Sequence, residues 1–380
     1  MNQAASTLVP MSATTRCLKW TNLVFMLYLL LLSVAMVSSG FKWATADQAK
    51  ELFAFASHPV ASLMIGLTAT ALIQSSSTVT SIIVGLVAGG LPVQVAIPMI
   101  MGANIGTTVT NTLVSLGHIR DPQEFKRAFS GATIHDFFNL FAVAIFLPLE
   151  IMFGLLEKIS SFLVSPFMET GNVSIKDFNF IKPLTKPVVN AVKEPLASFG
   201  DTIGGIMLIA LGIISIFIAI TVMGKLMKSL MVGRAREILK NAIGRGPIHG
   251  IASGTIMTVL VQSSSTSTSL MVPLVGNGVV KVRDIYPFTL GANIGTCVTA
   301  LLAATAVSTN MEFALQIALV HLSFNVLAIL LIFGVPFLRE IPMKGAEWIS
   351  DLAVKNKAIV AVYLVSVFIV LPGVILALTA

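Results

Sequence analysis

The chain has 380 residues, of which 56% are hydrophobic and only 11% are charged, and its mean hydropathy is +0.92. These values exclude a soluble protein and predict an all-α integral membrane protein with several crossings. The formal charge of +7 does not indicate nucleic-acid binding, because the basic residues fall between apolar segments, where they influence membrane topology. Only two cysteines, Cys17 and Cys297, are present, which argues against a disulfide framework.

Candidate membrane spans follow one another along the chain, and each crossing needs about 20 apolar residues. They are predicted at about 22–40, 92–117, 125–162, 200–223, 284–308, 313–338 and 358–378. The first has features of a signal peptide, since it follows Arg16 and Lys19, but we interpret it as a span that pairs with 200–223. The run 125–162 exceeds one crossing, so we expect it to tilt or to begin outside the bilayer.

Two polar motifs occur twice in the same order. Gln-Ser-Ser-Ser-Thr stands at 74–78 and again at 262–266, 188 positions later, and we call these two segments the pentads. Gly-Ala-Asn-Ile-Gly-Thr stands at 102–107 and again at 291–296, and we call these the hexads. Identical motifs at a constant spacing indicate an internal duplication.

A looser echo supports the duplication, because His-Asp-Phe-Phe-Asn at 135–139 corresponds to His-Leu-Ser-Phe-Asn at 321–325. We therefore predict a first repeat at 1–163 and a second at 199–338. Each pentad interrupts apolar sequence that is too short to cross the bilayer; the run before the first one, Leu63–Ile73, has 11 residues. We predict two re-entrant hairpins, at about 58–91 and about 247–280, with the pentads at their tips.

Basic residues predict the orientation of the chain. The segment 224–246 carries six basic residues and one acid, so we assign it to the cytoplasm, and the amino terminus with it. Three crossings per half make the two repeats inverted, as in many secondary transporters. The segment 164–198 becomes an external loop, although its four lysines oppose the rule. The segment 339–380 forms a cytoplasmic loop and the final span, which places the carboxyl terminus outside.

The pentads predict an anion-binding site. In each hairpin the second helix begins just after the serines, so its free N–H groups and the positive end of its dipole point at the ligand. Hydroxyl donors without arginine or lysine suit an oxyanion that must be held and then released. The phosphate-binding candidates are Gln74, Ser75, Ser76, Ser77, Thr78, Gln262, Ser263, Ser264, Ser265 and Thr266. Alternatively, these hydroxyls satisfy helix carbonyls or allow close helix packing.

The hexads predict a cation site. Glycines in an apolar segment allow a helix to unwind, and unwound carbonyls coordinate sodium in membrane transporters. With hydroxyl and amide oxygens added, the sodium-binding candidates are Asn104, Thr107, Thr108, Asn293, Thr296, Gln74, Gln262 and Asp136. The alternative is that the glycines only pack helices closely.

Asp136 stands out as a carboxylate in a predicted span, which is a functional hypothesis by default. Its partner would be a sodium ion or the neighbouring His135. Alternatively, it is a solvated charge at the membrane boundary. Because Leu322 stands at the equivalent position of the second repeat, any role is confined to one half. We interpret His135 and His321 as hydrogen-bonded core histidines and assign them no chemistry.

The pentads, the hexads and the stretch from Arg127 to Asn139 resemble the type II sodium-dependent phosphate cotransporters, over roughly residues 20–378. The resemblance implies an inverted-repeat symporter that takes up inorganic phosphate with sodium. It also implies that the pentads hold phosphate and sodium and that Asp136 accompanies electrogenic transport. Animal members have a longer, disulfide-bonded external loop, whereas 164–198 contains no cysteine. A chain of this length resembles a bacterial member, which implies the inner membrane as its location.

The expected mechanism is alternating access, with sodium as co-substrate and with no other cofactor. One rival is a sodium-coupled carrier of sulfate or of a dicarboxylate. A rival of another class is an intramembrane serine hydrolase, but a duplicated nucleophile has no use and no Gly-x-Ser-x-Gly surrounds the serines. A passive channel would conduct without sodium. The expected partners are phosphate, sodium and the lipid bilayer, and the oligomeric state is not predicted.

Overall fold

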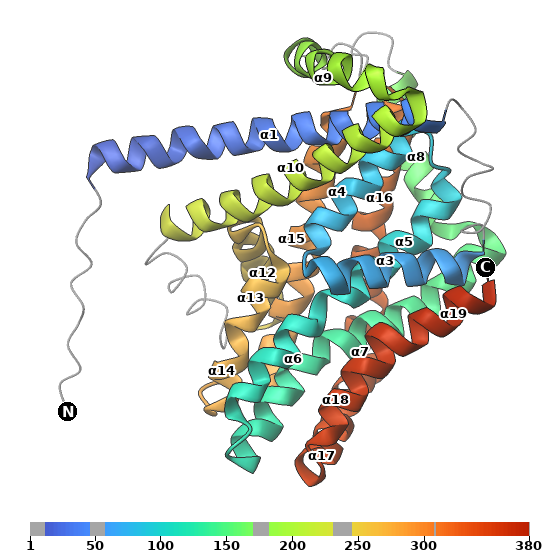
Figure 1. The fold of residues 1–380 in the computed structure, drawn as a ribbon. Coiled ribbons are helices and arrows are strands. Elements are labelled where there is room, and N and C mark those ends of the chain that lie inside the picture. The colour runs from blue at the N-terminus through green and yellow to red at the C-terminus, as the bar shows by residue number, and fades with distance from the viewer. Residues whose placement is uncertain (1–11, 46–57, 170–181, 231–244, 308, 380) are drawn as a thin grey trace.

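The computed structural model describes residues 12–45, 58–169, 182–230, 245–307 and 309–379. Within these ranges the regular structure is entirely helical (Figure 1). Part of the predicted external loop and most of the basic segment 224–246 lie outside the described residues.

In the described ranges, seven helical segments are long and apolar enough to cross a membrane, one at each predicted span. Their bounds are Ala13–Thr45 (α1), Val93–His118 (α5, η2, α6 and η3), Pro122–Phe153 (α7), Asp201–Leu230 (α10), Val282–Thr305 (α15), Met311–Phe333 (α16 and η5) and Ala358–Thr379 (α18, η6 and α19). Apolar runs of this length form helices in a bilayer because a helix satisfies its own backbone polar groups.

The span predicted over 125–162 is present but ends at Phe153, and a second helix follows it. Helix α7 ends at Phe153, and α8 covers Leu155–Glu169. Between them Gly154 adopts φ +60°, a left-handed conformation that glycine tolerates and that ends a helix. The carboxylate of Glu150 accepts the backbone N–H of Leu156 at 2.6 Å and so bridges the break.

Two segments that we predicted as loops contain helices. Helix α9 (Lys182–Leu196) lies within the predicted external loop, and α17 (Pro336–Lys355) lies within the predicted cytoplasmic loop. Helix α17 packs along α7, where Ser130 Oγ donates to Ser350 Oγ at 2.9 Å. Both helices have an apolar face and a charged face, and the mixed composition lowers the average hydropathy that identified the spans.

Each pentad joins two helices. In the first half α3 (Pro59–Ile73) precedes it and α4 (Ser76–Gly89) begins within it. In the second half α12 (Pro247–Val261) is followed by α13 (Ser264–Ser269) and α14 (Met271–Gly276). The first member of each pair packs along the helix that carries the hexad, α3 on α5 (Val93–Ile105) and α12 on α15.

The hexad glycines allow these pairs to approach closely. A Cβ added to Gly102 would lie 1.9 Å from the carbonyl oxygen of Leu63, and one added to Gly291 would lie 1.9 Å from that of Ile251. No side chain fits at either position, so these glycines allow close helix packing in both halves.

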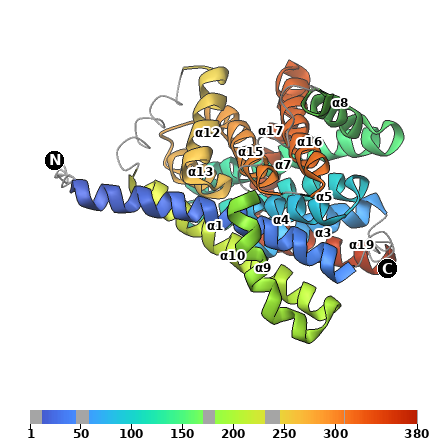
Figure 2. The ribbon, with the colours of Figure 1, turned by 90° about the horizontal axis from the view of Figure 1, so that it is seen from above.

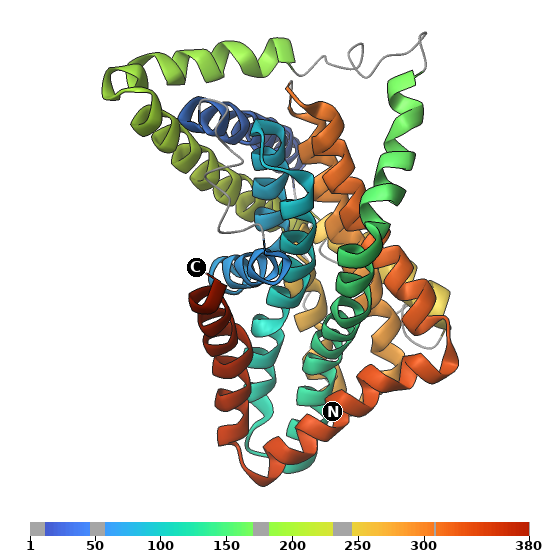
Figure 3. The ribbon, with the colours of Figure 1, turned by 90° about the vertical axis from the view of Figure 1, so that its right-hand side faces the viewer.

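Helices α9 and α17 lie at opposite ends of the molecule, which we call the α9 end and the α17 end (Figures 1 and 3). Viewed from above, α9 lies beside the crossing of α1 and α10 (Figure 2). At this end Asn310 Nδ2 donates to the carbonyl of Ala88 at 3.2 Å, which connects the α16 start to the α4 terminus.

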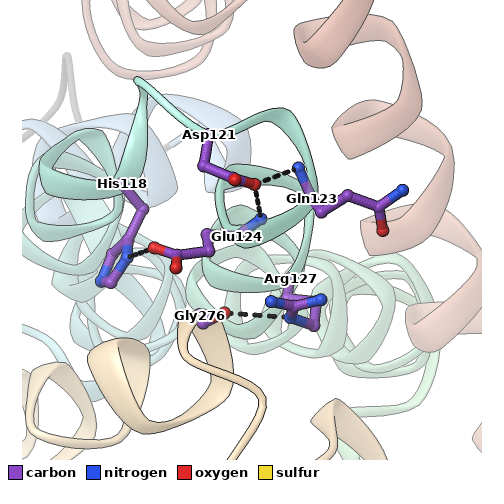
Figure 4. A network of polar contacts seen from close by, with 6 residues as sticks. All are labelled: His118, Asp121, Gln123, Glu124, Arg127 and Gly276. Carbon is purple, nitrogen blue, oxygen red and sulfur yellow. Dashed lines mark hydrogen bonds and ion pairs between the residues drawn. The ribbon is translucent and has the colours of Figure 1, made fainter.

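At the α17 end, the start of α7 in the first half contacts the end of α14 in the second half (Figure 4). Asp121 caps α7 by accepting the backbone N–H groups of Gln123 and Glu124 at 2.8 and 2.9 Å. His118 contacts the carboxylate of Glu124 at 3.1 Å. On the next turn Arg127 Nε donates to the carbonyl of Gly276 at 2.9 Å, which anchors α7 to the end of α14.

Candidate functional site

The two pentads adopt the same conformation. Gln74 and Gln262 end α3 and α12 in the left-handed region, with φ of 58° and 56°. The following serines cap the next helices: Ser75 Oγ accepts the N–H of Thr78 at 3.3 Å, and Ser263 Oγ accepts that of Thr266 at 3.1 Å. A serine N-cap followed by a free helix start leaves further N–H groups directed outward from the helix.

The two pentads meet inside the protein. Ser76 and Ser264 are the first residues of α4 and α13, and their hydroxyl oxygens are 3.5 Å apart. Both side chains are buried, with 3% of each exposed. The starts of two helices from different halves therefore lie close together, and both dipoles are positive at this point.

The second pentad also contacts the first hexad. Ser265 Oγ donates to the carbonyl of Thr107 at 2.9 Å. Next to this contact, Asn111 and Thr268 bond reciprocally, with Asn111 Nδ2 donating at 2.9 Å and Asn111 Oδ1 accepting at 3.1 Å. The sequence reasoning missed both residues, although the run of hydroxyl residues continues past the second pentad to Ser269.

The glutamine side chains make equivalent bonds in the two halves. Gln74 Oε1 accepts the hydroxyl of Thr110 at 2.7 Å, and Gln262 Oε1 accepts that of Thr299 at 3.1 Å. Each amide nitrogen turns back to a carbonyl, of Ala71 or Val259. Our reasoning missed both threonines, although each lies three residues after a hexad and the repeat could have indicated them. Gln74 is exposed, whereas Gln262 is buried.

The first hexad ends in a 3₁₀ turn, which is a tighter helix and not an unwound segment, and the second hexad lies in a continuous α-helix. After α5 the chain forms a 3₁₀ turn at Gly106–Thr108. In this turn the carbonyl oxygen of Thr107 accepts the hydrogen bond from Ser265 Oγ. Helix α15 continues without a break through the second hexad, so the prediction of unwinding is wrong at 291–296. The side chain of Thr296 donates to the carbonyl of Ala292 at 3.1 Å, within its own helix.

The remaining predicted threonines make bonds of the same kind. Thr107 Oγ1 donates to the carbonyl of Ala103, and Thr108 Oγ1 donates to that of Ile105, both at 3.1 Å. Their hydroxyl oxygens retain lone pairs that can accept a further partner.

A hydrogen-bonded core of His and Asn side chains links the two halves. His135 Nε2 donates to Asn293 Oδ1 at 2.6 Å, and Asn293 Nδ2 donates to Asn139 Oδ1 at 2.9 Å. The residues at the equivalent positions of the repeat make the same arrangement. His321 Nε2 donates to Asn104 Oδ1 at 3.1 Å, and Asn104 Nδ2 donates to Asn325 Oδ1 at 2.9 Å. The interpretation of both histidines as hydrogen-bonded core residues is confirmed, and the predicted sodium candidates Asn104 and Asn293 take part in this core.

Asp136 makes its described hydrogen bond with α18 and not with a pentad. It is fully buried, so the alternative of a solvated boundary charge is wrong. Its Oδ2 accepts the hydroxyl of Tyr363 in α18 at 3.0 Å, and its Oδ1 has no hydrogen-bond partner among the residues that the structure describes. The sequence reasoning missed Tyr363, and no motif marked it.

These contacts define what the site can bind. Buried hydroxyls and two helix starts provide neutral donors for an anion. No group of three or more His, Cys, Asp or Glu side chains forms a metal site among the described residues, whereas amide, hydroxyl and carbonyl oxygens are abundant around the pentads. Such oxygens are the ligands that hard cations prefer.

Comparison with known proteins identifies the family of this chain. The family described as Na+/Pi-cotransporter matches residues 29–173 and 215–339, one block in each half. Sodium-dependent phosphate transport protein 2A of Rattus norvegicus is 33% identical to this chain, over 95% of the chain and 68% of the relative. The 2B proteins of Bos taurus and Homo sapiens are 32% and 31% identical, over 93% and 91% of the chain and 64% and 63% of the relatives.

The chain thus spans about two thirds of the length of these relatives. No solved structure matches it. Because the family match covers both halves and most of the sequence, the chain belongs to the Na+/Pi-cotransporter family.

Proposed function

We propose that this chain is a sodium-coupled symporter that imports inorganic phosphate by alternating access. The observation that carries the proposal is the contact of Ser76 with Ser264 at 3.5 Å, where α4 and α13 begin. Two helix starts and their hydroxyls surround one position, and a phosphate dianion accepts hydrogen bonds from this kind of donor set. The printed names of the relatives, sodium-dependent phosphate transport proteins, agree with this ligand.

In this proposal the residues of both pentads bind phosphate directly or shape its pocket. Sodium binds beside them, at oxygens of Asn104, Thr107, Thr108, Asn293, Thr296, Gln74, Gln262 and Asp136. The carbonyl of Thr107, in the 3₁₀ turn, already faces the second pentad, as its bond with Ser265 indicates. Sodium bound there would offset the negative charge of phosphate and couple the two substrates.

The exchange of sides would proceed by movement of one half against the other. The pentads come from different halves. Their contacts with the opposite half, such as Ser76 with Ser264 and Ser265 with the carbonyl of Thr107 in the first hexad, would break in each cycle. We propose that the halves are inverted repeats and that each pentad lies at the tip of a re-entrant hairpin. This arrangement places the site near the middle of the bilayer, where unwound helices bind substrates in other transporters.

The distribution of basic residues supports a cytoplasmic α17 end and amino terminus. Lysine and arginine are plentiful at this end, including Lys126, Arg127, Arg283, Arg339 and Lys344. Positive residues favour the cytoplasmic side. The α9 end then faces outward, in the inner membrane of a bacterium.

We also propose that transport is electrogenic. Moving one net charge across 100 mV contributes about 2.3 kcal/mol, which sustains a roughly fifty-fold gradient. Asp136 is a buried carboxylate without a positively charged partner among its hydrogen bonds, so it can contribute to the charge that moves.

A serine hydrolase finds no support in the site. Its nucleophile needs a base within hydrogen-bond reach. The Nε2 atoms of His135 and His321 are engaged with Asn293 and Asn104, and neither histidine bonds to a pentad serine. The relatives are likewise transport proteins by name.

The proposal is tested by labelled phosphate uptake into liposomes that contain the purified protein. We expect an inward sodium gradient to drive uptake, an equal potassium gradient not to, and excess sulfate not to compete. Potassium-supported uptake would contradict sodium coupling, and competition by sulfate would favour the rival anion carrier.

Site variants then test the pentads. Loss of a hydrogen bond to a charged ligand removes about 1.5–3 kcal/mol, so Ser76→Ala and Ser264→Ala are each expected to raise the KM for phosphate about tenfold or more. The matched control is Ser160→Ala, because Ser160 is fully buried and its hydroxyl donates to the carbonyl of Glu157, away from the pentads. Equal effects of all three variants would show that the pentad hydroxyls are structural.

A further inference from the structure

A cationic pocket of about 370 Å³ lies at the α9 end, between α1, α9 and the residues before α16. Three lysines line it, Lys42 from α1 and Lys186 and Lys193 from α9, and none of its described lining residues is acidic. The lining also offers neutral hydrogen-bonding groups, from Ser38, Ser39, Thr185, Asn190 and Thr309. Three positive charges with hydroxyl and amide groups suit a phosphate group.

The pocket is held in place by packing and hydrogen bonds. An apolar cluster fixes α9 against α1 and α10, formed by Leu32, Met36, Val189, Leu196 and Leu208. The hydroxyl of Tyr28 donates to the carbonyl of Leu184 at 2.9 Å, which anchors the start of α9. The ammonium of Lys193 lies 4.3 Å from the ring centre of Trp43, a cation–π contact that limits its motion.

The only acidic group with a described contact to this wall is already engaged. Asp201 Oδ1 accepts the indole N–H of Trp43 at 2.8 Å, at the edge of the ring. The lysine ammonium groups therefore have no described salt bridge with a carboxylate, and they retain N–H donors for a ligand.

The pocket and the first pentad lie at opposite ends of one helix. Ser38 and Thr309 both lie in the pocket wall, and their hydroxyl oxygens are 3.4 Å apart. Thr309 Oγ1 also donates to the carbonyl of Ala88 at 3.4 Å. Ala88 belongs to the last turn of α4, which begins at Ser76. A helix of 14 residues is about 21 Å long, so the pocket lies about this far from the pentads.

We propose that this pocket binds a phosphate-bearing anion at the outer end of the protein and concentrates it there before transport. The inference rests on the proposed function and orientation. It also accounts for Lys186 and Lys193, two of the four lysines at 164–198 that oppose the positive-inside rule in an external segment. Electrostatic capture raises the local concentration of an anion and weakens as salt screens the charges.

The test compares two triple variants in phosphatidylcholine liposomes. Lys42→Gln, Lys186→Gln and Lys193→Gln are combined in one protein. The matched control combines Lys344→Gln, Lys355→Gln and Lys357→Gln, which removes the same charge from exposed positions of α17 and the start of α18. Initial rates of sodium-driven phosphate uptake are measured against phosphate concentration, with and without added choline chloride.

We expect the pocket variant to raise the KM about fivefold and to lose most of the salt dependence of the KM, while its maximal rate falls by less than half. The control variant should stay within twofold of the original protein in both respects. If the two variants have the same KM and salt dependence, the proposal is overturned. Absence of sodium-driven uptake by the original protein would instead contradict the proposed function.

A second measurement separates free phosphate from a lipid headgroup as the source of the ligand. The original protein and both variants are purified from liposomes that contain phosphatidylglycerol, and the retained lipid is quantified by mass spectrometry. Loss of retained phosphatidylglycerol only in the pocket variant, with an unchanged KM, would identify a headgroup site and overturn the capture of phosphate for transport. A raised KM with equal lipid retention would identify free phosphate, and no change in either quantity would exclude the site.

Discussion

Asp136 gives the sharpest prediction at the scale of single residues. Asn at this position keeps the shape of the side chain and removes its charge, so Asp136→Asn should reduce the charge that moves in each cycle. We expect uptake by the original protein to rise several-fold when a potassium diffusion potential makes the liposome interior negative. The rate of the variant should change less than twofold under the same potential.

Tyr363→Phe is the matched control for this measurement, because it removes the hydroxyl that Asp136 accepts at 3.0 Å and preserves the carboxylate. Its transport should remain dependent on potential. A variant with Asn at position 136 that keeps the full dependence would show that the carboxylate does not contribute to the moving charge.

The same residues show what the sequence could predict. The pentads were identifiable because they repeat, and the structure brings Ser76 and Ser264 together across 188 positions. Tyr363 was not identifiable, since it lies in an ordinary apolar span and its role arises only from a contact 227 positions away. Burial of Asp136 likewise depends on the packing of α18, which no local pattern describes.

At the scale of elements, the close contact of α3 with α5 predicts a strong effect of a single methyl group. Gly102→Ala would place a Cβ 1.9 Å from the carbonyl oxygen of Leu63, and the helices must separate. Overpacking of this kind destabilises by ~1–3 kcal/mol. We expect a lower midpoint in thermal unfolding of the purified protein, followed by the loss of its size-exclusion peak.

Gly117→Ala is the control, because a Cβ there meets no atom within 4 Å. Its midpoint should match that of the original protein. Equal midpoints for both variants would mean that α3 and α5 are not in close contact in the folded protein.

The elements themselves were predicted unequally. Long apolar runs identified all seven spans. In lipid the backbone N–H and C=O groups of such a run must bond to one another, and the helix achieves this. Helices α9 and α17 were missed because half of their surface is polar. The helix break at Gly154 was also missed, because an isolated glycine in an apolar run does not show whether it adopts the left-handed conformation.

At the scale of the whole molecule, the His and Asn core joins the two halves by reciprocal hydrogen bonds. Each histidine bonds to a hexad asparagine of the other half, as in His135 with Asn293 and His321 with Asn104. Neither half can satisfy these buried groups alone, and an unsatisfied buried polar group destabilises by about 1–3 kcal/mol. The halves are therefore held together at their centre by polar contacts, while the pentads make fewer contacts that can change during transport.

The orientation of the molecule follows from which segments share an end, and it can be tested by labelling. In a Cys17→Ser background, which leaves only the buried Cys297, we introduce Asn190→Cys in α9 or Lys355→Cys at the end of α17. Positions 190 and 355 are exposed. A maleimide that cannot cross membranes should label position 190 in intact cells and position 355 only after permeabilisation.

The reverse pattern would place the cationic pocket in the cytoplasm, where it could not collect phosphate for import, although the site at the pentads would be unaffected. Labelling of both positions in intact cells would mean that α9 and α17 share a side, which an odd number of spans between them excludes. The three spans between these helices are α10, α15 and the α16 segment, and the number stays odd if the segment around the second pentad turns back on itself as a hairpin. A single crossing by that segment would make the number even. The labelling pattern therefore tests whether this segment crosses once, as well as the orientation.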